Sequence, residues 1–365
     1  MLVAGQKQQK GMVINMNRLK KPTVVILIVV LLIGVAACGG KPTVTFTSWN
    51  ECDALTGLTD YVRAVTDEKS KDFIPVADRI AVFDMDGTLC GELFPEYIEY
   101  LLLAYRCLDD PDYEASDELK EVANLIRESG KDYKTPAVSD FDQVHGRAQA
   151  KAFAGMTADE FITYVRNFLK QPAQGFEGMT YAESIYKPMI EVVAYLQAND
   201  FTVYVVSGSD RMICRAVACE ALNIPENQII GMDVTMHTTN QPADKDNLHY
   251  QFNDGGEDQL VRGDEMWIKN LKMNKVWQIA QEIGKQPVLS FGNSSGDVSM
   301  HEYTVTGNKY RAMAFMLVAD DAERDHADLT ETAKRLAQWQ ERGYTVISMK
   351  NDFKTIYGEN VILVK

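Results

Sequence analysis

Hydrophobic positions along the chain follow two alternating patterns, short apolar runs and longer stretches with helical spacing. The apolar runs are rich in β-branched and aromatic residues, as expected of strands buried on both faces. They cover residues 79–84, 202–206, 288–291 and 314–318. The stretches with helical spacing cover residues 49–66, 185–198, 211–222 and 276–283. Strand and helix in turn are typical of parallel sheets with crossover helices. The pattern therefore predicts an α/β fold, with a Rossmann-like parallel sheet and helices on both of its faces.

The segment between residues 90 and 178 lacks such apolar runs. Its hydrophobic positions have helical spacing over residues 94–108, 116–129 and 157–169. We therefore expect residues 90–178 to form a mostly helical cap. The cap would be inserted into an α/β core made of residues 49–89 and 179–365.

A nearly pure apolar run of about 14 residues, 24–37, follows several basic residues near the amino end. It is short for a membrane-spanning helix, which needs roughly 20 residues. A basic leader before a short apolar run is typical of a secretory signal. The run ends in Val35-Ala36-Ala37-Cys38, which resembles the lipobox of bacterial lipoproteins, whose cysteine is lipidated and becomes the first mature residue.

These features predict a lipoprotein-type signal peptide over residues 1–37 and a linker over residues 38–48. The exported chain would then be tethered to a membrane only through the lipid on Cys38. An ordinary signal peptide or a membrane anchor that contains Cys38 is the alternative. Translation could start at any of the first three methionines, Met1, Met12 or Met16.

The chain of 365 residues carries a net charge of −15 at neutral pH. Residues 1–37 hold five basic and no acidic residues, so the remainder carries −20. Such a surface repels nucleic acid and anionic membranes, which argues against binding to nucleic acid. An anionic substrate would need a local cation where it binds. Five cysteines follow Cys38 without a C-x-x-C pair, so the sequence indicates neither a zinc site nor a dense disulfide framework.

Two aspartates follow the first apolar run, in Phe83-Asp84-Met85-Asp86-Gly87-Thr88-Leu89. Side chains of a strand alternate between its faces, so Asp84 and Asp86 would face the same way if the strand continued. Gly87 allows a sharp exit from the strand. Open α/β sheets bind ligands at the carboxyl ends of their strands. Two carboxylates at that place repel each other unless a cation or a shared proton joins them.

Three further polar clusters end or follow predicted strands. Ser207 and Gly208 end one strand and offer a hydroxyl group to a phosphate oxygen. Lys275 precedes the helix predicted over residues 276–283, where a cation is unfavourable unless an anion lies between it and the helix amides. Residues 292–297 form a glycine-bounded polar turn with one carboxylate. Each cluster alone has an ordinary structural explanation, but their order on successive strand ends indicates a site.

In type and order, the four clusters resemble the motifs of the haloacid dehalogenase superfamily, specifically its phosphatases with a helical C1-type cap after the first motif. Motif I corresponds to residues 83–89, motif II to residues 203–207, motif III to Lys275, and motif IV to residues 292–297. Lys272, one turn earlier, is the alternative for motif III. Three flanking stretches resemble a phosphoserine-phosphatase-like bacterial subgroup: Ala154-Gly155-Met156-Thr157, Tyr186-Lys187-Pro188-Met189 and Asp320-Asp321-Ala322-Glu323-Arg324.

The resemblance implies a Mg²⁺-dependent hydrolase of a small phosphorylated metabolite, such as a phosphoserine- or phosphocholine-like ester. Asp84 would be the nucleophile that forms an aspartyl-phosphate, and Asp86 would act as general acid and base. The Mg²⁺ ligands implied by the motifs are Asp84, Asp86, Asn293 and Asp297. The residues implied to hold the phosphoryl group are Ser207, Gly208, Lys275 and Thr88. True dehalogenases of the superfamily lack the second aspartate, so phosphate ester hydrolysis is favoured.

One position departs from the family pattern, and two acids mark the start of the cap. Asn293 stands where many relatives carry a metal-binding aspartate, so we expect a modest affinity for Mg²⁺. Asp297 is then the only carboxylate of motif IV. Glu92 and Glu96 would lie on the substrate side, where they would suit a cationic leaving group. A solvated helix start is the alternative for these two glutamates.

Two other functions fit parts of the same pattern. The turn from Gly292 to Gly296 also matches G-x-S-x-G, the nucleophile elbow of α/β-hydrolases, with His301 or His326 available for a triad. That interpretation leaves the paired aspartates unexplained. Asn293 also allows a lipoprotein that keeps the fold to bind a phosphorylated ligand without hydrolysing it.

Overall fold

The computed structural model describes residues 44–93, 97–130 and 136–364. The apolar run over residues 24–37, the lipidation site Cys38 and the substrate-side residue Glu96 lie outside these ranges and stay predictions. Within the described ranges, no helix is both long and apolar enough to cross a membrane.

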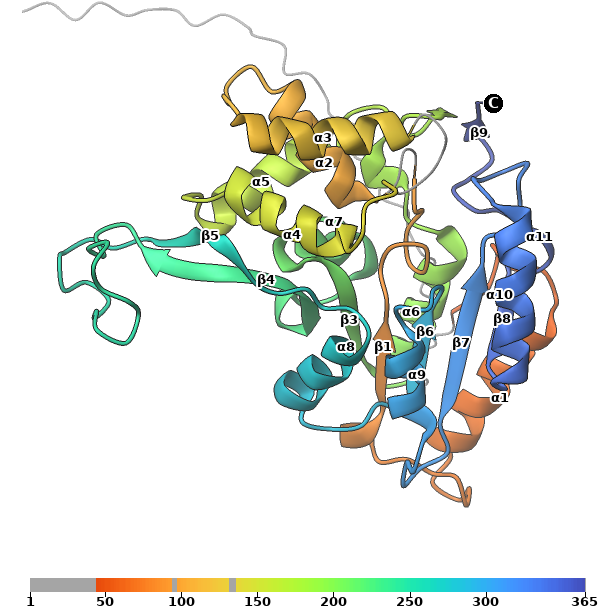
Figure 1. Cartoon of the computed structure of the whole chain (residues 1–365). Coiled ribbons are helices and arrows are strands. Elements are labelled where there is room, and N and C mark those ends of the chain that lie inside the picture. Colours follow the sequence, from red (N-terminus) through yellow and green to blue (C-terminus); the bar gives the residue numbers. More distant parts are fainter. Residues whose placement is uncertain (1–43, 94–96, 131–135, 365) are drawn as a thin grey trace, which may run out of the picture.

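A seven-stranded sheet forms the centre of the molecule, with strand order β5-β4-β3-β1-β6-β7-β8 (Figure 1). Its strands are β1 (Ile80–Phe83), β3 (Thr202–Asp210), β4 (Ile229–Thr238), β5 (Leu260–Ile268), β6 (Leu289–Gly292), β7 (Met313–Val318) and β8 (Thr345–Ser348). Neighbouring strands are parallel, except that β5 runs antiparallel to β4. The predicted α/β fold with a parallel core is confirmed, while the complete sheet is mixed because of β5.

Strand β1 lies in the middle of the sheet and is buried on both faces. Ala81 and Phe83 point into the larger hydrophobic core, and Ile80 and Val82 point into a second cluster on the opposite face. Phe83 pairs with Phe291 of β6, and their rings stack at 4.2 Å. Because β1 is parallel to both β3 and β6, the carboxyl ends of these three strands meet at one edge of the sheet.

Helices cover both faces of the sheet. They are α1 (Asp53–Thr66), α6 (Lys187–Ala198), α7 (Arg211–Leu222), α8 (Met273–Gln278), α9 (Val298–Val305), α10 (Leu329–Glu341) and α11 (Met349–Asp352). The larger core buries side chains of α1, α6 and α7, and the second cluster contains Met300 of α9. The helix expected over residues 276–283 begins three residues earlier, at Met273, and continues as a π-helical turn, Ile279–Ile283. The elements after β7 were not predicted.

Four helices follow β1 and form one group beyond the strand ends (Figure 1). They are α2 (Ile98–Leu108), α3 (Asp117–Gly130), α4 (Phe141–Ala152) and α5 (Ala158–Phe168). Three of them correspond to predicted helices, whereas α4 was missed. A two-residue strand, β2 (Phe176–Glu177), ends this part of the chain and pairs antiparallel with β9 (Ile362–Leu363).

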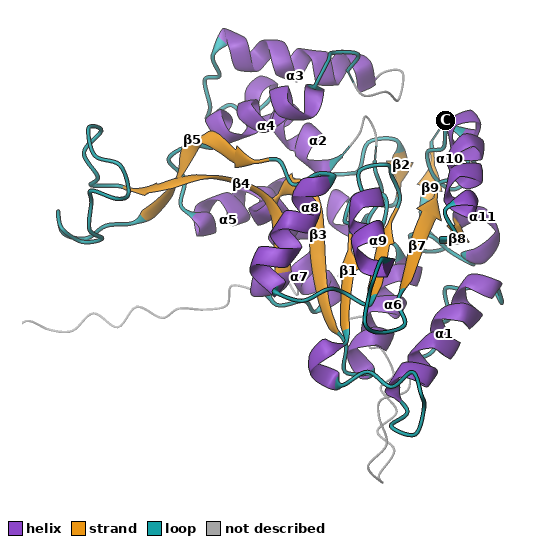
Figure 2. Ribbon diagram, turned by 60° about the horizontal axis from the view of Figure 1, so that its bottom comes forward, coloured by secondary structure: helices purple, strands orange, loops and turns teal. Residues whose placement is uncertain are grey.

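Strands β4 and β5 project from the body of the molecule as a long antiparallel hairpin (Figures 1 and 2). This hairpin was not predicted from the sequence. Its base contacts α4 at Gly146, where a Cβ atom would collide with the sulfur of Met266 on β5. Glycine therefore allows α4 to approach the hairpin closely.

Residues 47 and 48, which the sequence analysis placed in the linker, are bonded to the core. The backbone N–H groups of Thr47 and Ser48 each donate a hydrogen bond of 3.1 Å to the Glu191 carboxylate on α6. Both hydroxyl groups donate to the same carboxylate. This buried glutamate therefore holds the segment before α1 against α6.

Candidate active site

Motif I leaves the sheet at the end of β1. The backbone N–H of Asp84 still donates to the carbonyl of Phe291 at 2.9 Å, and the chain then turns. Gly87 has a φ of +76°, and a Cβ atom there would collide with the side-chain amide of Asn293. Glycine is therefore required both by the backbone conformation and by the approach of motif IV. The sharp exit expected from the sequence is present.

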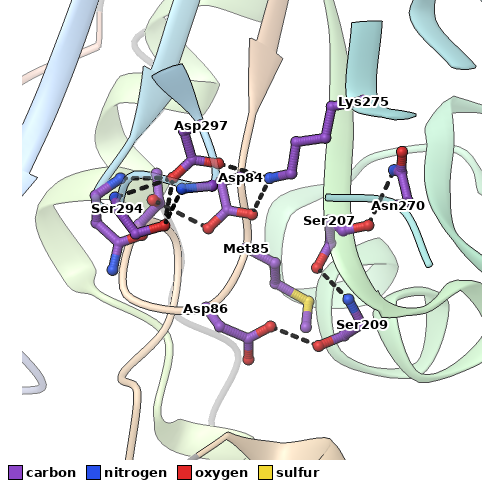
Figure 3. A network of polar contacts seen from close by, with 12 residues as sticks. Asp84, Met85, Asp86, Ser207, Ser209, Asn270, Lys275, Ser294 and Asp297 are labelled. Carbon is purple, nitrogen blue, oxygen red and sulfur yellow. Dashed lines mark hydrogen bonds and ion pairs between the residues drawn. The ribbon is translucent and has the colours of Figure 1, made fainter. Parts of the chain in front are cut away.

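Lys275 joins motif I to motif IV (Figure 3). Its Nζ atom lies 2.5 Å from an Asp84 carboxylate oxygen and 2.6 Å from an Asp297 carboxylate oxygen. Lys275 is fully buried, whereas Lys272 is exposed to solvent. Of the two lysines that fit motif III, Lys275 is therefore the one that contacts the aspartates. It is the third residue of α8 and not a residue before the helix.

The turn of motif IV is organised around the Asp297 carboxylate. The Oδ2 atom of Asp297 accepts hydrogen bonds from the backbone N–H groups of Asn293 and Ser294, at 3.1 and 3.0 Å. The Ser294 hydroxyl donates to the same oxygen at 3.2 Å. The side-chain amide of Asn293 instead donates to Glu92 at 2.7 Å. Glu92, expected on the substrate side, thus contacts motif IV directly.

Asp84 and Asp86 have different partners. The Ser209 hydroxyl donates to Asp86 Oδ2 at 2.7 Å, so Asp86 faces the end of β3, whereas Asp84 faces Lys275 (Figure 3). The Thr88 hydroxyl lies 3.5 Å from the second oxygen of Asp84, the upper limit for a hydrogen bond. The sequence placed the two aspartates together but did not reveal Ser209, because a serine at a strand end is common.

The end of β3 brings the other expected phosphate-binding residues to the same corner. The Ser207 hydroxyl oxygen accepts a hydrogen bond from the Ser209 backbone N–H at 3.0 Å. The Asn270 side chain donates to the Ser207 carbonyl at 3.0 Å and so fixes this turn from the β5–α8 connection. A Cβ atom at Gly208 would lie 2.4 Å from a methyl carbon of Leu271, so any other residue there would require that side chain to move. Asn270 was not singled out in the sequence.

Burial and like charges raise the pKa values of the motif I aspartates. The pKa of Asp84 is raised by burial first and by the Asp297 charge second, against the opposing effect of Lys275. Burial raises the pKa of Asp86 to about 7, although the hydrogen bond from Ser209 lowers it. The pKa of Asp297 is lowered, because the Lys275 charge and hydrogen bonds outweigh the effect of burial. The corner therefore holds more buried negative charge than one lysine neutralises.

A model of the haloacid dehalogenase-like hydrolase family matches residues 81–302, which is more than half of the chain and includes all four motif regions. The chain belongs to this family. A search of curated proteins finds no match.

Several solved structures are similar to this family member at low sequence identity. A conserved protein of unknown function from Anaerococcus prevotii DSM 20548 is similar with a TM-score of 0.50 and 14% identity, over 86% of this chain and 99% of that one. A phosphoserine phosphohydrolase-like protein from Francisella tularensis subsp. tularensis SCHU S4 has a TM-score of 0.38 and 13% identity, over 74% of this chain and 94% of that one. A cytosolic 5′-nucleotidase IIIB bound to cytidine has a TM-score of 0.43 and 13% identity, over 84% of this chain and 83% of that one.

The geometry around motif IV does not form the serine hydrolase triad considered above. The Ser294 hydroxyl donates to Asp297, and its oxygen accepts from the backbone N–H of Gly296. The buried His301 ring contacts the Ser290 hydroxyl. The ring of His326 packs against Phe176. Membership of the hydrolase family above accounts for the paired aspartates that a triad would leave unexplained.

The residues of this corner fit an oxygen-binding cation such as Mg²⁺, which the family generally uses. Within the described ranges, no group of three or more His, Cys, Asp or Glu side chains is placed to hold a metal. Lys275 contacts one oxygen of Asp84 and one of Asp297, but the second oxygen of Asp297 is also bonded, to the backbone of residues 293 and 294, whereas the second oxygen of Asp84 has only the long contact with Thr88. The Asp86 carboxylate accepts from Ser209. A cation would therefore be held by the Asp84 carboxylate, the Asp86 backbone carbonyl and the Asn293 amide oxygen, and the predicted ligand Asp297 would position the turn that carries Asn293. These are hard oxygen donors, and a cation would offset the excess negative charge.

Proposed function

We propose that this hydrolase is a Mg²⁺-dependent phosphomonoesterase that works through an aspartyl-phosphate on Asp84. The observation that carries the proposal is the different environment of the two motif I aspartates. Asp84 contacts a buried lysine, which opposes the rise in its pKa caused by burial and by the Asp297 charge, and so favours its charged, nucleophilic form. Asp86 lies against a hydroxyl group and has a pKa of about 7, so it can hold a proton near neutral pH. Two carboxyl groups with separated roles are the pattern expected of acid–base catalysis.

In the first step, an oxygen of Asp84 attacks the phosphorus atom and the bond between phosphorus and the ester oxygen breaks. The departing alkoxide takes the proton of Asp86, so the alcohol leaves neutral. In the second step, water gives a proton to Asp86 and attacks the same phosphorus atom. The acyl phosphate bond then breaks, which restores the Asp84 carboxylate and releases inorganic phosphate.

Other residues would position the phosphoryl group and balance its charge. Bound Mg²⁺ would supply neutralisation of the phosphoryl oxygens beside Asp84. Lys275 is the only cation that directly contacts Asp84 in the described residues, and it would stabilise the charge that develops on the transferred group. The Ser207 hydroxyl and the backbone around Gly208 would donate hydrogen bonds to it from the end of β3.

The test is Mg²⁺-dependent hydrolysis of p-nitrophenyl phosphate by the purified chain and by Asp84→Asn. We expect the substitution to reduce turnover by about 10³-fold or more, since it removes the nucleophile but keeps the size of the side chain. Asp60→Asn, at an exposed aspartate of α1, is the matched control and should retain full activity. Trapping of ³²P on the wild-type chain, but not on Asp84→Asn, would identify the covalent intermediate.

A wild-type chain that binds phosphate esters but turns over none of them would contradict the proposal. The second candidate function, binding of a phosphorylated ligand without hydrolysis, would then apply. It is favoured by one observation, the neutral Asn293 in the turn where a carboxylate is usual. Calorimetric titration of glycerol 3-phosphate into the same preparation would distinguish a ligand-binding protein from an inactive preparation.

A further inference from the structure

A second group of buried polar side chains lies between the helices after β1 and the end of the β4–β5 hairpin. It consists of Glu99 on α2, His145 and Gln149 on α4, and Lys269 directly after β5, and it is called here the cap–core polar cluster. All four side chains are buried, and His145 and Gln149 have no exposed surface. His145 and Gln149 are four residues apart and so lie on the same face of α4.

The cluster adjoins the acid of the proposed reaction. Glu99 accepts hydrogen bonds from Lys269 Nζ at 2.6 Å and from the backbone N–H of Asp210 at 3.2 Å. Asp210 follows Ser209, whose hydroxyl donates to Asp86. The charge of Glu99 raises the pKa of Asp86, and that of Lys269 lowers it, which places both within electrostatic reach of Asp86. Asp86 protonates the leaving alcohol in the proposed mechanism, so the cluster lies on the leaving-group side.

Two side chains of the cluster lack hydrogen-bond partners. Both ring nitrogens of His145 and both amide atoms of Gln149 are buried without a partner. The His145 ring does lie near Glu99: its Nδ1 atom is 3.5 Å from the carboxylate, and the Glu99 backbone raises the pKa of the ring, but neither contact has the geometry of a hydrogen bond. A buried polar atom without a partner loses its hydration with no compensation, and such atoms in native proteins call for an explanation. Four of them on one helix face indicate a missing polar partner.

The charges around these atoms are already paired. Glu99 is paired with Lys269, and Asp210 is paired with Arg262 at 2.6 Å. Burial lowers the pKa of the His145 ring well below its ordinary value, so the ring is neutral, with one donor and one acceptor. A cationic or anionic ligand would find no unpaired counter-charge in the cluster. A neutral group with hydroxyl donors and acceptors would match His145 and Gln149.

We propose that the cap–core polar cluster is the leaving-group subsite, and that it selects phosphate esters of neutral, hydroxyl-rich alcohols such as polyols and sugars. This inference rests on the proposed phosphomonoesterase function. It differs from the cationic leaving group suggested by Glu92 and Glu96, because Glu92 is bonded to Asn293. His145 and Gln149 have no exposed surface, and His145 packs against Glu99 and Tyr100 of α2, so the ester reaches the subsite only when α4 moves relative to α2 and the hairpin. Buried water on these atoms is the competing explanation, and it predicts no dependence on the substrate.

The experiment compares four esters: glycerol 3-phosphate, glucose 6-phosphate, phosphocholine and p-nitrophenyl phosphate. Gln149→Leu and Gln149→Met remove the amide while nearly keeping its volume, and two variants guard against one that does not fold. Gln143→Leu, on the exposed side of α4, is the matched control. We expect both Gln149 variants to lower kcat/KM for the two polyol esters by about 10- to 100-fold, mainly through KM. Activity on p-nitrophenyl phosphate should change less than about 2-fold.

Two results would overturn the subsite. One is an equal effect of the Gln149 variants on all four esters, and the other is a wild-type preference for phosphocholine over the polyol esters. Equilibrium binding of glycerol 3-phosphate to Asp84→Asn, with and without Gln149→Leu, tests the subsite independently of turnover. If the wild-type chain hydrolyses none of the esters, the proposed function fails. The subsite is then supported by weaker binding in the double variant and overturned by unchanged binding.

Discussion

The catalytic corner and the cap–core polar cluster are both buried, and both are built from charged and polar side chains. In the corner, the lysine and the two aspartates that it joins are bonded to one another. In the cluster, the charges are also paired, but His145 and Gln149 carry four polar atoms without partners. The corner therefore presents a fixed arrangement, and the cluster presents unused hydrogen-bonding capacity.

This difference matches what each region would have to recognise. The phosphoryl group is the same in every phosphate ester, so a rigid, fully bonded arrangement can be complementary to its transition state. The alcohol differs from one ester to the next, and its recognition requires groups that become bonded only when it is present. Hydrogen-bonding groups left unpaired by the wrong ligand are an effective source of selectivity.

Lys275→Met removes the ion pairs of the catalytic corner and has the largest combined effect expected on stability and turnover. It leaves Asp84 and Asp297 buried without their counter-charge, which costs about 3–5 kcal/mol of stability for a broken buried pair. Hydrolysis of p-nitrophenyl phosphate should fall by about 10²–10³-fold, as expected for loss of one preorganised group. Chemical denaturation and steady-state kinetics measure the two effects.

Lys272→Met is the control for this variant, since Lys272 is exposed and lies three residues earlier in the chain. It should change stability and turnover very little. If Lys272→Met reduces turnover more than Lys275→Met, the assignment of motif III to Lys275 is wrong.

The corner could be predicted from the sequence because its residues lie at strand ends. Each has a local signature: two aspartates and a glycine after an apolar run, a serine and a glycine after the next, and a polar turn after a third. Parallel strands bring such ends together, so the sequence predicted both the elements and their meeting point. The boundaries of α8 were misplaced because Lys272, the residue before Met273, is not a typical N-cap residue.

The cluster could not be predicted because its residues come from distant elements without a local signature. Glu99 and Lys269 are 170 positions apart in the chain. Helix α4 was missed since part of its buried face is polar, namely His145 and Gln149, and hydrophobic periodicity does not register a polar buried face. The hairpin of β4 and β5 was missed as well, and with it the position of Lys269.

Asp86→Asn tests the boundary between the two regions, where Asp86 accepts a hydrogen bond from Ser209 and lies within electrostatic reach of Glu99. It removes the proton donor, so hydrolysis of glycerol 3-phosphate should fall by about 10²–10⁴-fold. Hydrolysis of p-nitrophenyl phosphate should fall much less, because its leaving group departs without a proton. Equal losses for both esters would show that Asp86 does not protonate the leaving group.

The same variant has a predicted effect on stability that depends on pH. The pKa of Asp86 rises from an ordinary value of 3.8 to about 7 in the folded chain, mainly through burial. The folded state therefore binds more protons than the unfolded state between these values, and its stability falls as pH rises from about 4 to 7. Asp86→Asn removes this pH-dependent fall in stability, because asparagine does not titrate. With a chelator present, it should be more stable than the wild type at pH 8 by on the order of 4 kcal/mol, and should gain nothing from this effect at pH 3.5.

Asn293→Asp has the smallest expected effect and alters the corner where it departs from the family pattern. The amide of Asn293 donates to Glu92, so an aspartate would place two carboxylates in contact. Burial already raises the pKa of Glu92, and a neighbouring charge would raise it further. Without a divalent cation, the variant should lose about 1 kcal/mol of stability. Added Mg²⁺ should reverse this loss of stability and should activate the variant at a lower concentration than the wild type, because an anionic oxygen replaces a neutral one.

Glu92→Gln in the Asn293→Asp chain is the matched control, since it removes the repulsion between the two carboxylates and should recover the stability without Mg²⁺. Thermal melts over a Mg²⁺ titration measure both effects, and a midpoint equal to that of the wild type would place the cation away from the turn of residues 292–297.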